Sequence, residues 1–211
     1  MDEMPKRIFI TGTDTDVGKT FISALLVKKW KMAYWKPFQT GLNCDPGDTK
    51  TVTGLIGAEL KTSSPAVELQ LPLSPWRATV LESKSLIDLN TINIPNEIQD
   101  LPLIIEGAGG VQVPINDKQI TTDLIKQFDV PVIVVARSEL GTLNHTLLTI
   151  EHLQNRKVKV LGVILNGDIN NDNADTLKAY GVNIICQIPK SKSLQEVEHL
   201  VPNLKDVYIY N

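Results

Sequence analysis

Short apolar runs alternate with longer amphipathic stretches along most of the chain. The runs are rich in β-branched residues, as buried strands are, and the stretches repeat apolar residues at helical spacing. The pattern predicts strands at 7–11, 32–35, 102–110 (running into a glycine-rich turn), 131–136, 158–166 and 183–189. It predicts helices at 18–30, 48–57, 121–128, 142–155, 172–180 and 193–200.

Strands that alternate with helices indicate a mostly parallel sheet with helices on both faces, which is a doubly wound α/β fold. Residues 58–100 contain four prolines and no clean period, so we expect loops and short helices there. The chain shows no internal repeat and no linker, so one domain over 1–211 is expected.

The link between the first strand and the first helix reads GTDTDVGKT, residues 12–20. The phosphate-loop pattern G-x-x-x-x-G-K-[ST] would need glycine at Thr13, and Gly12 stands one residue too early. A strand, a loop, GKT and a helix in this order nevertheless favour a phosphate loop over a glycine cap before a surface lysine. Free amides at the helix start would bind phosphate oxygens, Lys19 would add charge, and Thr20 would ligate Mg²⁺.

Two carboxylates, Asp14 and Asp16, lie in a loop that should attract anions. Carboxylates repel phosphates unless a cation lies between them. We therefore expect Mg²⁺, or an amine of a second substrate, beside these aspartates.

Three charged residues are expected at the carboxyl edge of the sheet, where α/β proteins bind ligands. Lys36 follows the second strand and would neutralise phosphate charge, unless it is a solvated lysine. Glu106 ends an apolar strand and would ligate a metal, unless loop amides satisfy it. Asp48 is either a third metal ligand or the N-cap of its helix.

Two later strand ends carry weaker signals. Gly141 and Thr142 open a helix, which fits either an anion site or an ordinary capped start. Asn166 ends a strand and fits either a contact to a purine edge or a turn residue. His145 and His152 have no third ligand type nearby, so no zinc site is expected.

Composition excludes several classes of partner. The chain has 211 residues, 21% of them charged, with a net charge of −3 and no basic stripe, so neither nucleic acid nor an anionic membrane is an expected partner. No apolar run reaches 18 residues and the start MDEMPKR lacks a secretory signal, which favours a cytoplasmic protein. Cys44 and Cys186 are expected to be unpaired thiols.

Four motifs together resemble the dethiobiotin synthetase family: TGTDTDVGKT (11–20), KPFQTG (36–41), EGAGG (106–110) and LGTLNH (140–145). Their order and spacing match that family from residue 8 to about 190, whereas GKT alone is unspecific. The phosphate loop of the family contains the additional residue, which explains the position of Gly12. Residues 58–100 and the tail after 190 match poorly, so no role is transferred to them.

The resemblance implies a P-loop NTPase fold and a ligase of biotin biosynthesis that uses ATP and Mg²⁺. One amine of 7,8-diaminopelargonate takes up CO₂ as a carbamate, which attacks the γ-phosphate to form a carbamic-phosphoric anhydride. The second amine then closes the cyclic urea of dethiobiotin. The family is homodimeric, and the segment matching 140–144 reaches the active site of the other subunit.

The resemblance also implies residue roles, with Asp16 standing where many relatives have glutamate. Catalytic roles fall to Lys19, Lys36 and Thr15. Magnesium ligation falls to Thr20, Asp48 and Glu106. Nucleotide contacts fall to Thr13, Asp14, Asp16, Val17, Gly18, Lys19, Thr20, Asn166, Ile188 and Pro189. Substrate contacts fall to Thr15, Lys36, Thr40, Gly109, Leu140, Gly141, Thr142 and Asn144.

Three other functions compete with this one. An amidoligase of the cobyrinic acid diamide synthase type would carry a glutaminase domain, and neither cysteine has such a context. A switch ATPase of the ParA/MinD type would have a signature lysine about where Asp14 stands, and a basic amphipathic tail unlike VPNLKDVYIYN. A non-catalytic nucleotide-binding module would not need two lysines and three candidate metal ligands.

Overall fold

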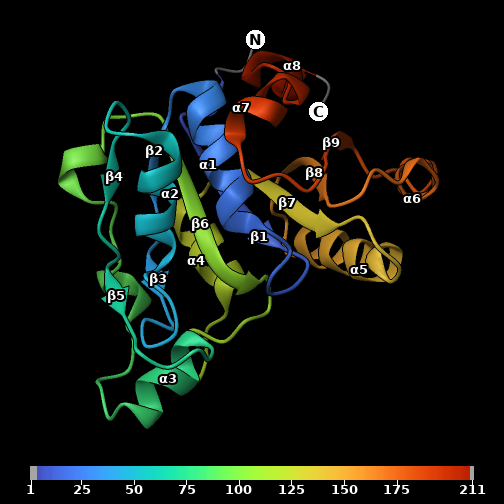
Figure 1. The fold of residues 1–211 in the computed structure, drawn as a ribbon. Coiled ribbons are helices and arrows are strands. Elements are labelled where there is room, and N and C mark those ends of the chain that lie inside the picture. Colours follow the sequence, from blue (N-terminus) through green and yellow to red (C-terminus); the bar gives the residue numbers. More distant parts are fainter. Residues whose placement is uncertain (1–3, 210–211) are drawn as a thin grey trace.

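The computed structural model describes residues 4–209 and is built around a parallel sheet of seven strands (Figure 1). Their order is β4-β2-β6-β1-β7-β8-β9, so the chain starts near the middle of the sheet and winds outward in both directions. The strands are β1 (Arg7–Gly12), β2 (Ala33–Trp35), β4 (Thr62–Ser63), β6 (Leu103–Gly110), β7 (Val132–Arg137), β8 (Val160–Asn166) and β9 (Ile184–Ile188).

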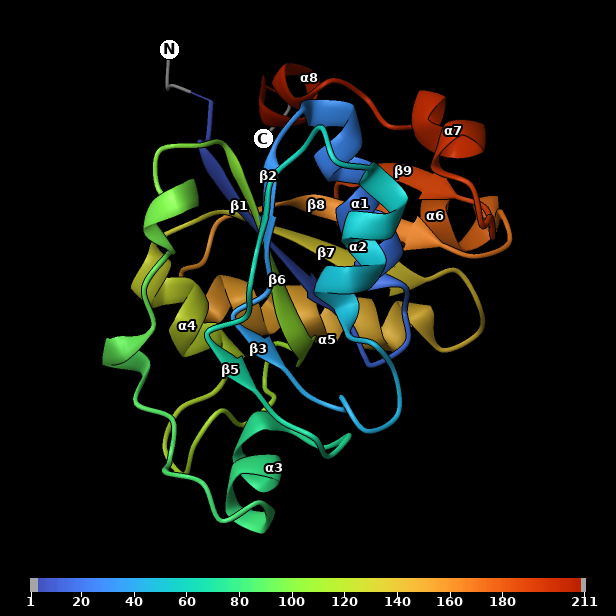
Figure 2. The same cartoon turned by 60° about the vertical axis from the view of Figure 1, so that its left-hand side comes forward.

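Helices cover both faces of this sheet (Figures 1 and 2). Side chains alternate along β1, so Ile8 and Ile10 enter the core on one face and Phe9 enters the core on the other. The first face carries α1 (Lys19–Trp30), α2 (Asp48–Ile56), α7 (Leu194–Val197) and α8 (Leu204–Ile209). The second carries α4 (Thr121–Phe128), α5 (Thr142–Asn155) and α6 (Asn171–Ala179). The predicted doubly wound α/β fold is confirmed.

Residues 58–100 form loops and short elements, as expected, but they also contain strands that the sequence pattern did not reveal. β4 adds an edge to the main sheet, and β5 (Val67–Glu68) pairs with β3 (Phe38–Gln39) in a separate parallel pair. Strands of two residues are too short to show a period. The rest of the segment contains α3 (Pro75–Leu81) and 3₁₀ turns at Leu89–Thr91 and Asn96–Ile98.

The glycine-rich stretch after Glu106 is strand rather than turn, which corrects the sequence expectation. β6 continues to Gly110 because it stays paired with β1, although the register shifts between Ile10 and Gly12. A side chain at Gly107 would lie 2.7 Å from the ring of Phe9. Gly107 therefore allows close packing between neighbouring strands and not the approach of a ligand.

Three further expectations concern the ends and the surface. The start MDEMPKR and the tail VPNLKDVYIYN both include residues outside the described chain, namely 1–3 and 210–211. The described part of the tail forms α8, whose Val207 is buried against the core beside α1.

Within residues 4–209 no helix has the length and apolarity to cross a membrane. Cys44 and Cys186 are both free thiols, as expected.

Candidate active site

A cavity of about 810 Å³ opens at the carboxyl edge of the sheet, where the ends of β1, β2 and β6 meet. Parallel strands bring residues that are distant in sequence to one edge, which is where α/β folds bind ligands. The cavity wall includes ten of the predicted site residues: Thr15, Asp16, Gly18, Lys19, Thr20, Lys36, Thr40, Asp48, Glu106 and Gly109.

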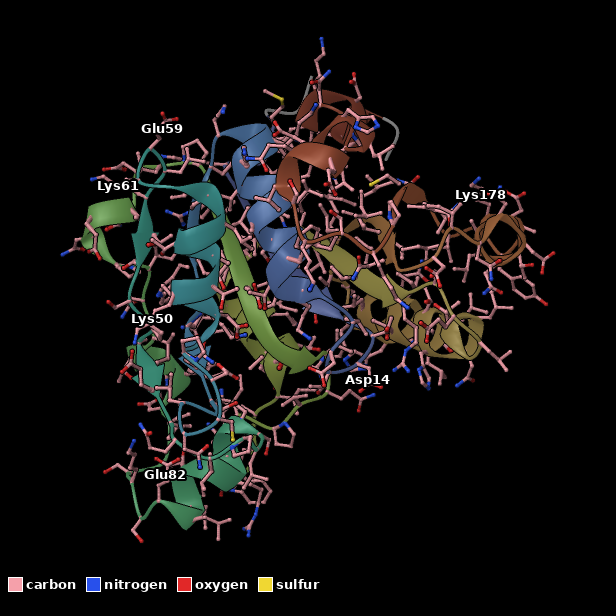
Figure 3. The ribbon with its side chains drawn as sticks, in the orientation of Figure 1. Asp14, Lys50, Glu59, Lys61, Glu82 and Lys178 are labelled. Carbon is pink, nitrogen blue, oxygen red and sulfur yellow. The ribbon has the colours of Figure 1, made fainter. Side chains whose placement is uncertain are left out.

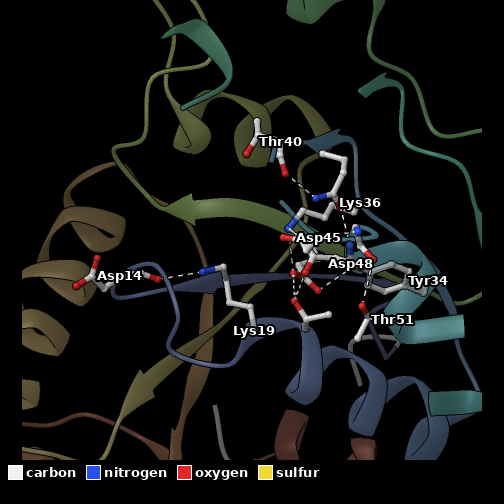
Figure 4. Close-up of polar contacts among 12 residues, drawn as sticks. Asp14, Lys19, Tyr34, Lys36, Thr40, Asp45, Asp48 and Thr51 are labelled. Atoms are coloured by element: carbon white, nitrogen blue, oxygen red, sulfur yellow. Dashed lines mark hydrogen bonds and ion pairs between the residues drawn. The ribbon is translucent and has the colours of Figure 1, made fainter. Parts of the chain in front are cut away.

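Lys36 and two carboxylates form the centre of the cavity (Figure 4). The Nζ of Lys36 lies 2.6 Å from Asp48 Oδ2 and 3.1 Å from Glu106 Oε1. The hydroxyl of Thr20 donates to Asp48 Oδ1 at 2.5 Å and lies 3.1 Å from Glu106 Oε1. Thus the three predicted magnesium ligands and one predicted catalytic lysine are in direct contact.

This arrangement decides three alternatives that the sequence left open. Lys36 is only 5% exposed, so it is not a solvated lysine. Glu106 is fully buried and its hydrogen bonds come from side chains rather than from loop amides. Gly47 is the N-cap of α2, and the backbone N–H of Asp48 donates to the side-chain oxygen of Gln39 at 2.8 Å. The carboxylate of Asp48 is thereby free to face Lys36.

The opposite charges of Lys36 and Asp48 keep both groups ionised. Burial alone would lower the pKa of Lys36, but the carboxylates of Glu106 and Asp48 outweigh burial and raise that pKa above its usual value. Burial would likewise raise the pKa of Asp48, yet Lys36 and the hydrogen bonds from Lys36, Thr20 and Gln39 lower it. At neutral pH the centre therefore contains an ammonium and a carboxylate held side by side.

Lys19 reaches the cavity from the first residue of α1. It is 7% exposed, and its Nζ donates to the backbone carbonyl of Asp14 at 3.0 Å (Figure 4). Burial, followed by the positive charge of Lys36, lowers the pKa of Lys19. The hydrogen bond of Lys19 goes to a neutral carbonyl, so an entering polyphosphate would give its ammonium group a negatively charged partner.

The hydroxyl contacts of the GKT motif end at Thr20. The next position holds Phe21, which has no hydroxyl. Phe21 is half-buried and packs against the core on the face of the sheet that α1 covers. Its ring has no hydrogen-bonding group to offer a phosphate, so the motif contributes the single hydroxyl of Thr20.

The phosphate loop is fastened to β8 by a residue expected to contact the base. The side-chain amide of Asn166 donates to the carbonyl of Val17 at 2.9 Å, so Asn166 is not merely a turn residue. Gly18 has φ +91°, and a side chain there would lie 2.1 Å from the Asn166 amide nitrogen. Glycine is required at this position both for its backbone conformation and for the close approach of Asn166.

The aspartates of the loop differ in their surroundings. Asp14, at the outer end of the loop between β1 and α1 (Figure 3), pairs with Arg137 at the end of β7, with Nη2 2.5 Å from Oδ2. The chain therefore supplies Asp14 with a cation of its own, and the expected external cation beside these aspartates stays a prediction. Asp16 is exposed, adopts φ +58°, and lines the cavity.

Several predicted residues lie away from the large cavity. Thr13 and Asp14 join Thr15 in the wall of a second cavity of about 380 Å³ that also includes His145. At the end of β9, the side chain of Ile188 is fully buried in the core, so only its backbone faces the edge of the sheet beside Asn166. Pro189 follows Ile188 and is half-buried.

The segment around the start of α5 is also outside the large cavity. Gly141 is the N-cap of α5, as predicted, and Thr142 is fully buried. Leu140 is 99% exposed, and Asn144 is also exposed. Within one chain, this segment does not meet the centre formed by Lys36 and the two carboxylates.

Sequence reasoning missed three residues that shape the site: Tyr34, Gln39 and Arg137. Tyr34 donates its hydroxyl to Glu106 Oε2 at 3.0 Å. It lies two residues before Lys36, and the two-residue repeat of a strand would have placed both on one face. Gln39 and Arg137 gave no comparable signal, because their partners, Asp48 and Asp14, are brought near them only by the fold.

The donor set fits Mg²⁺ bound to a nucleotide. Two carboxylates and a hydroxyl are hard oxygen ligands, which Mg²⁺ prefers, usually together with phosphate. Among residues 4–209 no group of three or more His, Cys, Asp or Glu side chains could hold a metal. The Thr20 hydroxyl contacts both carboxylates, so it could join Asp48, Glu106 and phosphate oxygens as a ligand. The Thr13 hydroxyl, at the start of the phosphate loop, is buried and has no hydrogen-bond partner in the described chain.

Comparisons with known proteins agree with this geometry. A family model described as "AAA domain" matches residues 6–198. An ATP-dependent dethiobiotin synthetase BioD of Paramagnetospirillum magneticum is 45% identical over 87% of each chain. The BioD of Cytophaga hutchinsonii is 39% identical over 91% of this chain and 93% of its own. A bifunctional BioCD protein of Bordetella avium is 46% identical over 88% of this chain, which spans only 40% of that protein.

Solved structures share the fold at low identity. A putative plasmid partition protein of Borrelia burgdorferi bound to AMPPNP aligns with a TM-score of 0.58 at 13% identity, over 99% of each chain. The cell division ATPase MinD of Pyrococcus furiosus aligns with a TM-score of 0.57 at 14% identity, over 93% of this chain and 89% of its own. These likenesses show a P-loop NTPase fold, and the identity to the BioD proteins shows that the chain belongs to the dethiobiotin synthetase family.

Proposed function

We propose that the protein uses ATP, Mg²⁺ and CO₂ to convert 7,8-diaminopelargonate into dethiobiotin, the cyclo-ligase step of biotin biosynthesis. The single observation that carries this proposal is the contact of Lys36 with both Asp48 and Glu106 in a cavity that the phosphate loop borders. The relatives named ATP-dependent dethiobiotin synthetase support the choice of reaction.

In this proposal the phosphate loop holds the triphosphate of ATP. Backbone amides at the start of α1 and the ammonium of Lys19 bind its oxygens, while Thr20, Asp48 and Glu106 would hold Mg²⁺. Bound there, Mg²⁺ supplies positive charge that offsets the negative charge on the phosphates. Thr13, Asp14, Asp16 and Val17 complete the loop around the nucleotide.

The first chemical step joins CO₂ to an amine of the diamine. The amine nitrogen forms a bond to the carbon of CO₂ and loses a proton, which gives a carbamate. Lys36, Thr15 and Thr40 would orient this anion, since all three line the cavity. The carbamate oxygen then bonds to the γ-phosphorus while the bond to the ADP oxygen breaks, and Lys19 and Lys36 stabilise the added charge.

Ring closure completes the reaction. The second amine attacks the carbonyl carbon of the carbamic-phosphoric anhydride, the carbon–oxygen bond to phosphate breaks, and the amine gives up a proton. Gly109 and Thr40 lie on the part of the wall that would face the substrate. The nearby acidic residue Asp16 suits a substrate that enters with two amines.

The remaining site residues fit a homodimer. We place the substrate carboxylate at Leu140, Gly141, Thr142 and Asn144 of a second copy, because this helix start lies outside the large cavity of its own chain. Leu140 is 99% exposed, so its side chain is available for contact with a second subunit. Asn166, with the backbone of Ile188 and Pro189, would border the adenine.

A switch ATPase is the competing function, because the solved structures similar in fold include MinD and a plasmid partition protein. Identities of 13–14% concern the fold and not the reaction. Asp14 occupies the position where a switch ATPase would have its signature lysine, and Arg137 pairs with Asp14. These features favour the synthetase.

Release of ADP should depend on the diamine. We expect rapid release with Mg²⁺-ATP, bicarbonate and 7,8-diaminopelargonate, and little release when the diamine is omitted, because the carbamate is the nucleophile. A coupled ADP assay measures this, and mass spectrometry of the product checks for the cyclic urea. Equal ADP release with and without the diamine would contradict the proposal and favour a switch or a general NTPase.

A further inference from the structure

Tyr34 lies beneath the centre of the site and is not accounted for by the reaction described above. Its side chain is fully buried, and its hydroxyl donates to Glu106 Oε2 at 3.0 Å (Figure 4). A buried phenol that donates to a buried carboxylate satisfies a polar group on each side. The hydrogen bond therefore fixes the Glu106 oxygen that neither Lys36 nor Thr20 contacts.

The two oxygens of Glu106 have separate partners. Oε1 accepts hydrogen bonds from Lys36 and Thr20, both at 3.1 Å, whereas Oε2 accepts one from Tyr34. A carboxylate held at one oxygen cannot rotate freely, so the other oxygen keeps its direction. Here the fixed direction of Oε1 is toward Thr20, which is the hydroxyl proposed as a metal ligand.

Strand geometry places Tyr34 and Lys36 on one face of β2 and its extension. Trp35, between them, packs into the core on the opposite face of the sheet. β6 is the neighbour of β2 in the sheet, with Tyr34 opposite Ile104, and this register brings Glu106 within reach of both side chains. Tyr34 of β2 and Lys36, one residue beyond the end of β2, thus contact different oxygens of Glu106.

Burial favours the protonated form of the Tyr34 phenol, which is the form that donates a hydrogen bond. Removal from water, followed by the negative charge of Glu106, raises the pKa of Tyr34 well above its usual value. Partners of metal-binding carboxylates orient the ligand, and their loss typically weakens metal binding about 10–100-fold.

We infer that Tyr34 is a positioning residue for magnesium, which directs Glu106 Oε1 toward the metal by holding Oε2. The inference rests on the proposed metal ligands Thr20, Asp48 and Glu106. Tyr34 has no proposed contact with substrate. Its replacement should therefore change how much Mg²⁺ strengthens nucleotide binding, and not nucleotide binding in the absence of metal.

The test is Tyr34→Phe, which removes one hydroxyl and keeps the ring. Calorimetry with a non-hydrolysable ATP analogue gives its affinity in EDTA and in Mg²⁺, and the ratio is the gain due to metal. We expect the affinity in EDTA to change less than twofold and the gain to fall about tenfold. Tyr180→Phe, at an exposed position, is the matched control and should leave the gain unchanged.

A double variant shows whether Tyr34 acts through Glu106. In the background of Glu106→Gln, adding Tyr34→Phe should lower the gain no further, because the oriented carboxylate is already absent. If the two substitutions lowered the gain independently, so that their effects multiplied in the double variant, the inference would be overturned. It would also be overturned if Tyr34→Phe left the gain unchanged, or if it lowered the affinity in EDTA as much as the affinity in Mg²⁺. No gain from Mg²⁺ in the natural protein would overturn the metal assignment as well.

Discussion

Replacing Lys19 with alanine is expected to lower the rate of ADP release by about 10²–10³-fold. Lys19 is buried at the start of α1, facing the cavity, and no other residue of the loop carries a positive charge. Its loss removes a fixed ammonium from the position where charge builds up on the transferring phosphate. Steady-state rates at saturating ATP, bicarbonate and diamine give the size of the effect.

The fold should survive this substitution, because alanine favours the helix. Circular dichroism should show the same helix content in the variant and the natural protein. Lys28→Ala, in the last turn of the same helix, is the control and should retain nearly full activity. A nearly normal rate for Lys19→Ala would remove the phosphate loop from the proposed reaction.

Lys36→Met should lose both activity and stability. Methionine has a similar length but no charge, so Asp48 and Glu106 would lose the ammonium that contacts both. Removing one partner from a buried ion pair typically costs about 3–5 kcal/mol of unfolding free energy. Turnover should fall at least about 10²-fold, because the same ammonium stabilises charge during phosphoryl transfer.

Denaturant unfolding at pH 7 without metal measures the loss of stability. The control is Lys50→Met, two residues after Asp48 on α2 and exposed (Figure 3), which should change the unfolding free energy by less than about 0.5 kcal/mol. If Lys36→Met proved as stable and active as Lys50→Met, the ion-paired centre would be neither structural nor catalytic.

The sequence predicted the centre of the site because its motifs follow strands of a parallel sheet. Lys19, Lys36 and Glu106 each follow or lie in an apolar run, and parallel strands carry such residues to one edge whatever their separation in sequence. Asp48 needed the structure, since a residue at a helix start is equally suited to capping the helix and to binding a metal.

Other features could not be predicted because they depend on pairings between distant segments. Glu106 lies in the middle of β6, since the strand continues to Gly110, which pairs with Gly12 of β1, instead of turning after Glu106. Arg137 neutralises Asp14 across 123 positions of sequence. Tyr34 looked like an ordinary apolar strand residue, and only the register between β2 and β6 shows its contact with Glu106.

A crystal structure with Mg²⁺ and a non-hydrolysable ATP analogue tests the central claim most directly. We predict that the triphosphate lies on the loop before α1, with Lys19 and Lys36 beside its terminal phosphate and the metal bound by Thr20, Asp48 and Glu106. A triphosphate bound elsewhere, or Lys36 directed away from it, would contradict the proposed reaction.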